Sequence, residues 1–404
     1  MHNLLRNVLA GYVGVLASFA PCALAQAQDI KIGFLGGFTG PLETMTPSIH
    51  EAAKLAVRQI NEQGGVLGQK LVMPQGDSTC LDVTAAVNAA DRMVNTEAVT
   101  ALVGPMCSGE TIAAANTAAI PAGVLLLTPS ATTPALTELD DKDLVFRMLA
   151  SDAFSGEALA RILKQKGVDN IAIAYVNNDY GRGFATALEA SFTREGGTVA
   201  ASEAHEDGKA DYRAELGSLA SSGADFLVVL AYVDGSGGTI IRQAIEGGDF
   251  ARFAGGDGMV GDSLVKAVGE GVLDGMIATR YGSTETEGTA IFDKAAREID
   301  IDPAAAFAAQ AYDAAFLIAL AIQERGENTR DELNVALRKV ATAPGEVILP
   351  GEWEKAARLI GEGKDINYEG AAGSHEFDAN GDVPGVVIEL VVDGPSFRDV
   401  GPVK

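Results

Sequence analysis

The chain has 404 residues with 55 acidic and 30 basic side chains, which gives a formal net charge of −25. A chain this negative repels the phosphates of nucleic acids and of anionic membrane surfaces, so neither is expected as a partner. Its length is sufficient for two domains with complete hydrophobic cores.

Residues 1–27 have the pattern of a secretory signal peptide. Arg6 lies in a short amino-terminal region, an apolar stretch of roughly 13 residues follows over 8–20, and small residues suited to cleavage end at Ala27. This stretch is too short to span a bilayer, so we expect it to be removed on export. Lipidation at Cys22 is the weaker alternative, because Pro21 stands where a small residue is required.

Short apolar segments that alternate with amphipathic runs then fill the chain as far as residue 279. The segments predict strands, and the runs between them predict helices such as Ile49–Glu62 and Ala153–Lys166, each closed by glycine. This alternation favours parallel sheets covered on both faces, and about ten strands are too many for one comfortable sheet. We therefore predict an α/β fold with two doubly wound lobes. The predicted strands are Ile30–Leu35, Lys70–Met73, Thr100–Val103, Val124–Leu127, Asn170–Val176, Gly197–Ala201, Phe226–Leu230 and Met276–Thr279.

Three helices are predicted after these strands, at Ala290–Glu298, Pro303–Glu324 and Thr329–Ala341. The second is too interrupted to be a membrane span, because Gln310 and Asp313 break its apolar run. The tail from residue 360 is rich in Gly and Asp. It predicts a hairpin-like turn at 378–382 and a strand at 386–391.

Two of the predicted strands end in glycine or proline followed by small hydroxyl residues. Ser108 follows the strand 100–103, and Ser130 and Thr132 follow the strand 124–127. Hydroxyl residues cap helices, and adjacent helix amino termini bind anions through free N–H groups and the helix dipole. We expect a small carboxylate there, although plain N-capping is the alternative.

Removal of the signal peptide would leave Cys80 and Cys107, an even pair in an oxidising compartment. A disulfide between them would stabilise the fold by about 3.5 kcal/mol in the chain-entropy treatment. Two unpaired buried thiols are the alternative.

Taken in order, the motifs resemble those of the periplasmic substrate-binding proteins for leucine, isoleucine and valine that serve ABC uptake systems. The resemblance covers nearly the whole mature chain. It is carried by Thr39-Gly40-Pro41, Ile60-Asn61 with Gly64-Gly65, Gly76-Asp77, Cys107-Ser108, Thr128-Pro129-Ser130-Ala131-Thr132, Asn178-Asp179-Tyr180-Gly181, Arg242-Gln243-Ala244 and Tyr312-Asp313-Ala314-Ala315.

The resemblance implies a type I periplasmic binding protein fold, with two Rossmann-like lobes joined by a three-crossover hinge that close around the ligand. The lobes would comprise 29–147 plus 280–375 and 148–279 plus 376–404. It further implies a monomer in the periplasm that binds a neutral, branched aliphatic L-amino acid, does no covalent chemistry, needs no cofactor and meets an inner-membrane ABC permease.

The resemblance also assigns roles to individual residues. Ser108 and Thr132 would hold the ligand carboxylate, the backbone at Ser130 and Ala131 would accept from its ammonium group, and Asp257 would complete the ammonium site. Many relatives carry glutamate at the position of Asp257. The walls would be formed by Tyr180, Tyr232, Phe307 and Met45, the last at a position where relatives often have an aromatic residue.

Several alternatives compete with this interpretation. Asp257 is also typical of a turn between glycines, and Tyr180 and Tyr232 are typical packing aromatics. The ligand could instead be a carboxylate or amide that is not an amino acid, such as an aromatic acid. Residues 256–261 match a dinucleotide-binding pattern, but no clear strand precedes them.

Other motif matches are weaker still. Residues 261–264 spell a hydrolase signature without its Asp-x-x-His partner, and residues 378–389 have calcium-loop spacing without the required glycine. The scattered histidines predict no metal site.

Overall fold

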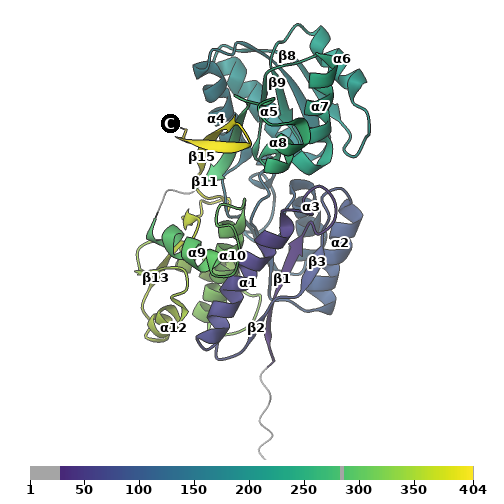
Figure 1. Cartoon of the computed structure of the whole chain (residues 1–404). Helices are drawn as coiled ribbons and strands as arrows, with labels where there is room; N and C mark the ends of the chain where they lie inside the picture. The colour runs from purple at the N-terminus through teal and green to yellow at the C-terminus, as the bar shows by residue number, and fades with distance from the viewer. Residues whose placement is uncertain (1–27, 283–285, 404) are drawn as a thin grey trace, which may run out of the picture.

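The computed structural model describes residues 28–282 and 286–403, which form two lobes, each with its own β-sheet (Figure 1). The predicted signal peptide, 1–27, lies outside the described residues. In the part of the chain that is described, no helix is both long enough and apolar enough to cross a membrane.

The first lobe is built on a parallel sheet with the order β2-β1-β4-β5-β6, and β3 pairs with the second half of β1. Its central strands β4 and β5 are short, largely apolar runs, typical of a sheet buried on both faces. Because the strands are parallel, the loops after them meet at one edge. The strands are β1 (Ile30–Gly36), β2 (Leu71–Val72), β3 (Gln75–Asp77), β4 (Ala101–Val103), β5 (Leu125–Thr128) and β6 (Val145–Arg147).

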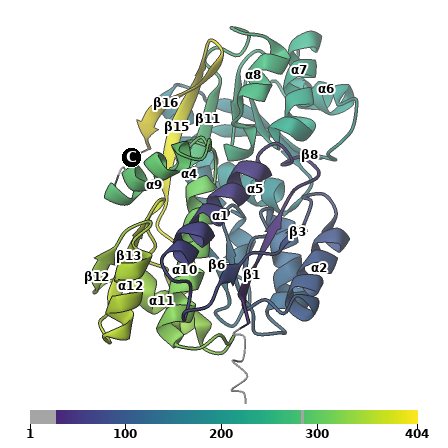
Figure 2. The ribbon, with the colours of Figure 1, turned by 60° about the horizontal axis from the view of Figure 1, so that its bottom comes forward.

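Helices cover both faces of this sheet, and α1 packs along α10 (Figure 2). The long α10 is buried on nearly every side, which its alanine-rich sequence permits. The helices are α1 (Thr46–Glu62), α2 (Val83–Asp91), α3 (Ser108–Ala114), α9 (Glu287–Arg297), α10 (Ala308–Arg325), α11 (Leu333–Ala341) and α12 (Trp353–Gly361).

The second lobe has a seven-stranded sheet in the order β16-β15-β11-β10-β9-β7-β8. Five strands are parallel, whereas β15 pairs antiparallel with β11 and β16 pairs antiparallel with β15. The strands are β7 (Asn170–Val176), β8 (Thr198–His205), β9 (Leu227–Leu230), β10 (Phe253–Gly255), β11 (Ile277–Gly282), β15 (Val386–Asp393) and β16 (Ser396–Pro402). The helices are α4 (Asp152–Gln165), α5 (Asp179–Arg194), α6 (Arg213–Ser221), α7 (Gly238–Gly247) and α8 (Asp262–Val268).

The chain passes between the lobes three times: after β6, after β11 and before β15. The predicted two-lobed fold with a three-crossover hinge is therefore confirmed. The expected boundary between residues 279 and 280 falls inside β11, which continues to Gly282. A small third sheet, of β12 (Glu346–Ile348), β13 (Ile366–Gly370) and β14 (Gly373–Ser374), lies beside α12 in the first lobe (Figure 1).

Two local predictions are wrong. The turn at 378–382 is not a hairpin, because β14 pairs with β13 whereas β15 pairs with β11. This turn instead holds Asp382 against Arg147 at the first crossover, with Nη2 2.7 Å from Oδ2. A strand also does precede the dinucleotide-like motif, namely β10. The motif itself forms a single 3₁₀ turn at Asp257–Met259, and α8 begins only after it, with Gly261 as the N-cap.

Candidate ligand-binding site

The loops after β4 and β5 are joined by a hydroxyl group. Ser108 Oγ accepts from the backbone N–H groups of Thr132 and Thr133, each at 3.3 Å. Ser108 is the first residue of α3 and is not its N-cap, while the second loop leads to a three-residue 3₁₀ turn at Pro134–Leu136. The prediction of two adjacent helix starts is therefore correct for the first loop only.

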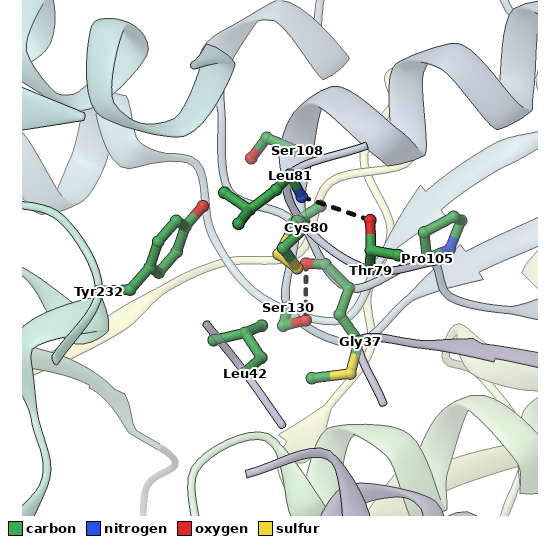
Figure 3. The surroundings of a disulfide bond; sticks show 12 residues. Gly37, Leu42, Thr79, Cys80, Leu81, Pro105, Ser108, Ser130 and Tyr232 are labelled. Carbon is green, nitrogen blue, oxygen red and sulfur yellow. Dashed lines mark hydrogen bonds between the residues drawn. A yellow bond between two sulfur atoms is a disulfide. The ribbon is translucent and has the colours of Figure 1, made fainter. Parts of the chain in front are cut away.

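The predicted disulfide between Cys80 and Cys107 is present, with the two Cα atoms 5.5 Å apart. It lies directly before Ser108, and Tyr232 faces it from another segment of the chain (Figure 3). Ser130 Oγ donates to the carbonyl oxygen of Met106 at 2.8 Å. The loop after β4 is thus held both by the disulfide and by this hydrogen bond to the loop after β5.

In the second loop, two carbonyl groups have no partner in the described part of the chain. The carbonyl oxygens of Ser130 and Ala131 accept no hydrogen bond, whereas the buried hydroxyl of Thr132 lies against the Asp152 carboxyl group and lowers its pKa. Buried polar groups are normally paired, so this loop presents free acceptors to a ligand.

The second lobe contributes two stacked tyrosines and a carboxylate. Tyr180, in the first turn of α5, stacks on Tyr232, which follows β9, with ring centroids 5.4 Å apart. The Tyr180 hydroxyl donates to Asp257 Oδ1 at 3.0 Å and accepts from the N–H of Gly258 at 3.2 Å. Asn178 Nδ2 donates to the Tyr232 hydroxyl at 3.1 Å.

These groups from the two lobes line one small cavity of about 30 Å³. Seven of the nine predicted ligand residues line it, whereas Ala131 and Thr132 are buried in the loop beside Ser130. Three of the seven also line a larger cleft of about 460 Å³ between the lobes. The seven are Met45, Ser108, Ser130, Tyr180, Tyr232, Asp257 and Phe307, and the three shared with the larger cleft are Met45, Asp257 and Phe307.

A second buried carboxylate, which the sequence analysis missed, lies close to Asp257. Asp152 is fully buried at the start of α4, where its Oδ1 accepts from the hydroxyl of Tyr281 at 2.8 Å and its carboxyl group also lies against the hydroxyl of Thr132. Burial raises the pKa of both carboxyl groups, and the charge of Asp257 raises the pKa of Asp152 further. Two carboxyl groups this close together are not easily ionised at the same time, and the one that is ionised attracts a cation.

The lobes meet closely on either side of the cavity. A Cβ atom on Gly109 would lie 2.9 Å from Asp179 Oδ2, and one on Gly183 would lie 2.7 Å from Thr133 Oγ1. Thr44, before α1, donates to Asp234 of the second lobe. The structure thus has the two lobes in contact around the site.

Within residues 28–282 and 286–403, no group of three or more His, Cys, Asp or Glu side chains is arranged to hold a metal ion. The serine of the hydrolase-like signature, Ser263, donates to Asp234 at 2.9 Å. The buried His205 pairs with Ser236 and not with Ser263, so Ser263 and His205 do not form a catalytic serine–histidine pair.

Two lobes with parallel sheets, three crossovers and a site at their junction define the class of periplasmic solute-binding proteins. The profile of the family described as "Periplasmic binding protein" matches residues 29–358, so the chain belongs to this family.

Among curated relatives, the chain is 33% identical over 326 residues to the leucine-, isoleucine-, valine-, threonine-, and alanine-binding protein of Pseudomonas aeruginosa, covering 80% of this chain and 85% of that protein. Among solved structures, the branched-chain amino acid transporter substrate-binding protein LivJ of Streptococcus pneumoniae in complex with isoleucine is 26% identical. Its TM-score is 0.76, over 93% of this chain and all of that one (100%). A leucine-binding protein LivK of Thermotoga maritima shares the fold at a TM-score of 0.79 and 24% identity, over 93% of this chain and 99% of that one.

Proposed function

We propose that this protein is a solute-binding protein of an ABC importer that takes a neutral, branched-chain aliphatic L-amino acid. The observation that carries the proposal is the division of the site. The Ser108 hydroxyl, suited to a carboxylate, and the carbonyl oxygens of Ser130 and Ala131, suited to an ammonium group, lie on the first lobe, and the buried Asp257 lies opposite them on the second. The named ligands of the relatives are of the same kind.

In this mechanism the ligand carboxylate docks first on Ser108 and on the hydroxyl and N–H of Thr132. The carbonyl oxygens of Ser130 and Ala131 then accept from the ammonium group. Closure brings Asp257 to that group, where a charge-assisted hydrogen bond offsets the cost of burying the carboxylate.

The aromatic and sulfur-containing walls would contact the ligand side chain. Tyr180 and Tyr232 enter from the second lobe, whereas Met45 and Phe307 enter from the first. A ligand that touches both lobes stabilises the closed arrangement over the open one, which is the basis of hinge closure in periplasmic binding proteins.

The remaining parts of the proposal concern the setting of the protein. We infer that residues 1–27 are removed on export, that the mature chain is a periplasmic monomer, and that the closed form meets an inner-membrane permease. We also infer that the lobes divide after residue 147, at the end of β11 and near residue 376. The protein would catalyse no reaction, and it would need no cofactor.

Isothermal titration calorimetry with leucine, isoleucine, valine, phenylalanine and benzoate tests the ligand class. We expect saturable binding of the aliphatic amino acids. Binding of benzoate without any amino acid would overturn the proposal in favour of an aromatic acid.

The Asp257→Ala variant tests the ammonium site. Removing a buried charge partner should weaken amino-acid binding by roughly 2–4 kcal/mol. Asp225→Ala is a matched control, because Asp225 precedes β9 at the opposite end of the same sheet and its side chain is 74% exposed. An unchanged affinity in Asp257→Ala would refute the assigned role.

A further inference from the structure

The larger cleft between the lobes has more room than an aliphatic side chain needs. It measures about 460 Å³ and continues from the small cavity past Met45, Asp257 and Phe307. Sites of about 300–1,000 Å³ are typical for whole small molecules. A side chain that leaves the ammonium site between Met45 and Phe307 therefore enters a space that leucine would not fill.

One buried amide lines this cleft without a partner. Gln310 lies in the first turn of α10, an 18-residue helix, and is only 8% exposed. Its side-chain amide makes no hydrogen bond with any residue in the described part of the chain. Its amide atoms are reached by solvent within the cleft, so the group is available to something that enters the cleft.

The backbone beside Gln310 is also unpaired. The N–H groups of Ala309 and Gln310 donate to no described residue, whereas the neighbouring Ala308 and Ala311 donate to Ala305 and Phe307. Free N–H groups at a helix amino terminus favour an oxygen acceptor and disfavour a cation.

The remaining charges of the cleft disfavour an anion. Its walls include Asp234, Asp262 and Asp302, and its arginine, Arg280, is already paired with Asp399 at 2.6 Å. A side chain that ends in a neutral group with both a donor and an acceptor satisfies Gln310 and the free N–H groups without meeting like charge. A carboxamide is such a group.

We propose that Gln310 and the free N–H groups at the start of α10 form a specificity subsite for an amide-bearing amino-acid side chain. The inference rests on the proposed amino-acid function and extends the ligand range from aliphatic side chains to glutamine or asparagine. Gln310 acts here by direct hydrogen bonding to the ligand.

A hinge role for Gln310 is the competing explanation. Gln310 also borders a cavity of about 20 Å³ lined by the crossover residues Ala150, Tyr281 and Gly385. A residue that served hinge closure would affect every ligand equally. A specificity residue would affect only the amide-bearing ligands.

The test is calorimetric titration of the wild type, Gln310→Leu and Gln310→Met with leucine, glutamine and asparagine. We expect the wild type to bind glutamine or asparagine as well as leucine. Both apolar variants should lose tenfold or more in affinity for the amide ligands, with leucine changed less than threefold. Gln165→Leu, the same change at the exposed end of α4, should alter neither.

The outcomes separate the two proposals. Leucine binding without any binding of glutamine or asparagine overturns the subsite and leaves the proposed function standing. Equal weakening of all ligands in both variants also overturns it, in favour of the hinge. Binding of the amide ligands that depends on Gln310, without binding of leucine, supports the subsite and refutes the aliphatic ligand class. Absence of all binding overturns both.

Discussion

Replacing Glu110 with glutamine should stabilise the protein at neutral pH. Glu110 lies in the first turn of α3 and is only 4% exposed. Its pKa is raised to about 7, mainly by burial and in smaller part by the negative charges of Asp179 across the lobe junction and of Asp82. The phenol of Tyr232 also faces this carboxyl group, while Arg182 near the junction is engaged with Asp179. Within the residues that the structure describes, no cation forms an ion pair with Glu110.

The magnitude follows from the difference between the folded pKa of about 7 and the ordinary value of 4.5. At about 1.4 kcal/mol per unit, the protonated carboxyl favours the folded state by up to about 3 kcal/mol. Because the folded pKa is the higher one, this contribution is complete below pH 4.5. It is lost as the pH rises through 7. Glutamine resembles the protonated acid at every pH, so the variant should gain on the wild type as the pH rises.

Urea unfolding at pH 4.5, 6 and 8 measures this effect as the difference in unfolding free energy between Glu110→Gln and the wild type. Taking the difference cancels the titration of all other groups. We expect the difference to grow by about 2–3 kcal/mol between the two extremes. Glu195→Gln, at the exposed end of α5, should show no such growth. A difference that is the same at all three pH values would refute the reasoning.

Three further perturbations test the frame around the site. Reducing the Cys80–Cys107 disulfide should lower the unfolding free energy by about 3–4 kcal/mol, measured by urea unfolding with and without reductant. An unchanged midpoint would contradict the expected role of the cross-link. Arg147→Ala should cost about 3–5 kcal/mol, because it leaves Asp382 without its buried partner at the first crossover. A loss below 1 kcal/mol in thermal or urea unfolding would show that the pair is dispensable. Tyr180→Phe removes one hydrogen bond to the ammonium-site carboxylate and should weaken amino-acid binding about tenfold by calorimetry, while stacking is retained. Wild-type affinity in this variant would show that the hydroxyl is not needed.

The fold could be predicted from the sequence where local patterns are strong. The strand at Asn170–Val176 was predicted with its observed bounds, because a long apolar run between a glycine-closed helix and a capped helix has few alternative structures. The three-residue strands β3, β10 and β12, by contrast, were not predicted, because their sequences QGD, FAG and EVI lack the uninterrupted apolar run that marks the equally short β4, ALV. α10 begins at Ala308, not at residue 303, because Phe307 adopts a left-handed conformation with φ of 64°.

The site could be predicted only in part. Residues that follow strands in recognisable motifs, such as Ser108 and Asp257, lie in the sequence beside the features that mark them. Asp152 has no such mark, because an acidic residue after Ser151 is an ordinary helix start. Both residues belong to the second lobe, and they come close only when its fold brings the start of α4 to the turn after β10. The sequence shows Gln310 as a polar residue that interrupts an apolar run. That its side chain lacks a hydrogen-bond partner can be seen only in the folded cleft.

The return of the chain to the second lobe as β15 and β16 restricts how this protein can be made or divided. The inner neighbour of β15 is β11, and the two strands are separated by about a hundred residues of the first lobe. Until the last segment has been synthesised, β11 has an open edge that can pair with other chains. A fragment covering only residues 148–279 should therefore aggregate. The second lobe can be isolated as a soluble unit only if 386–403 is joined to it.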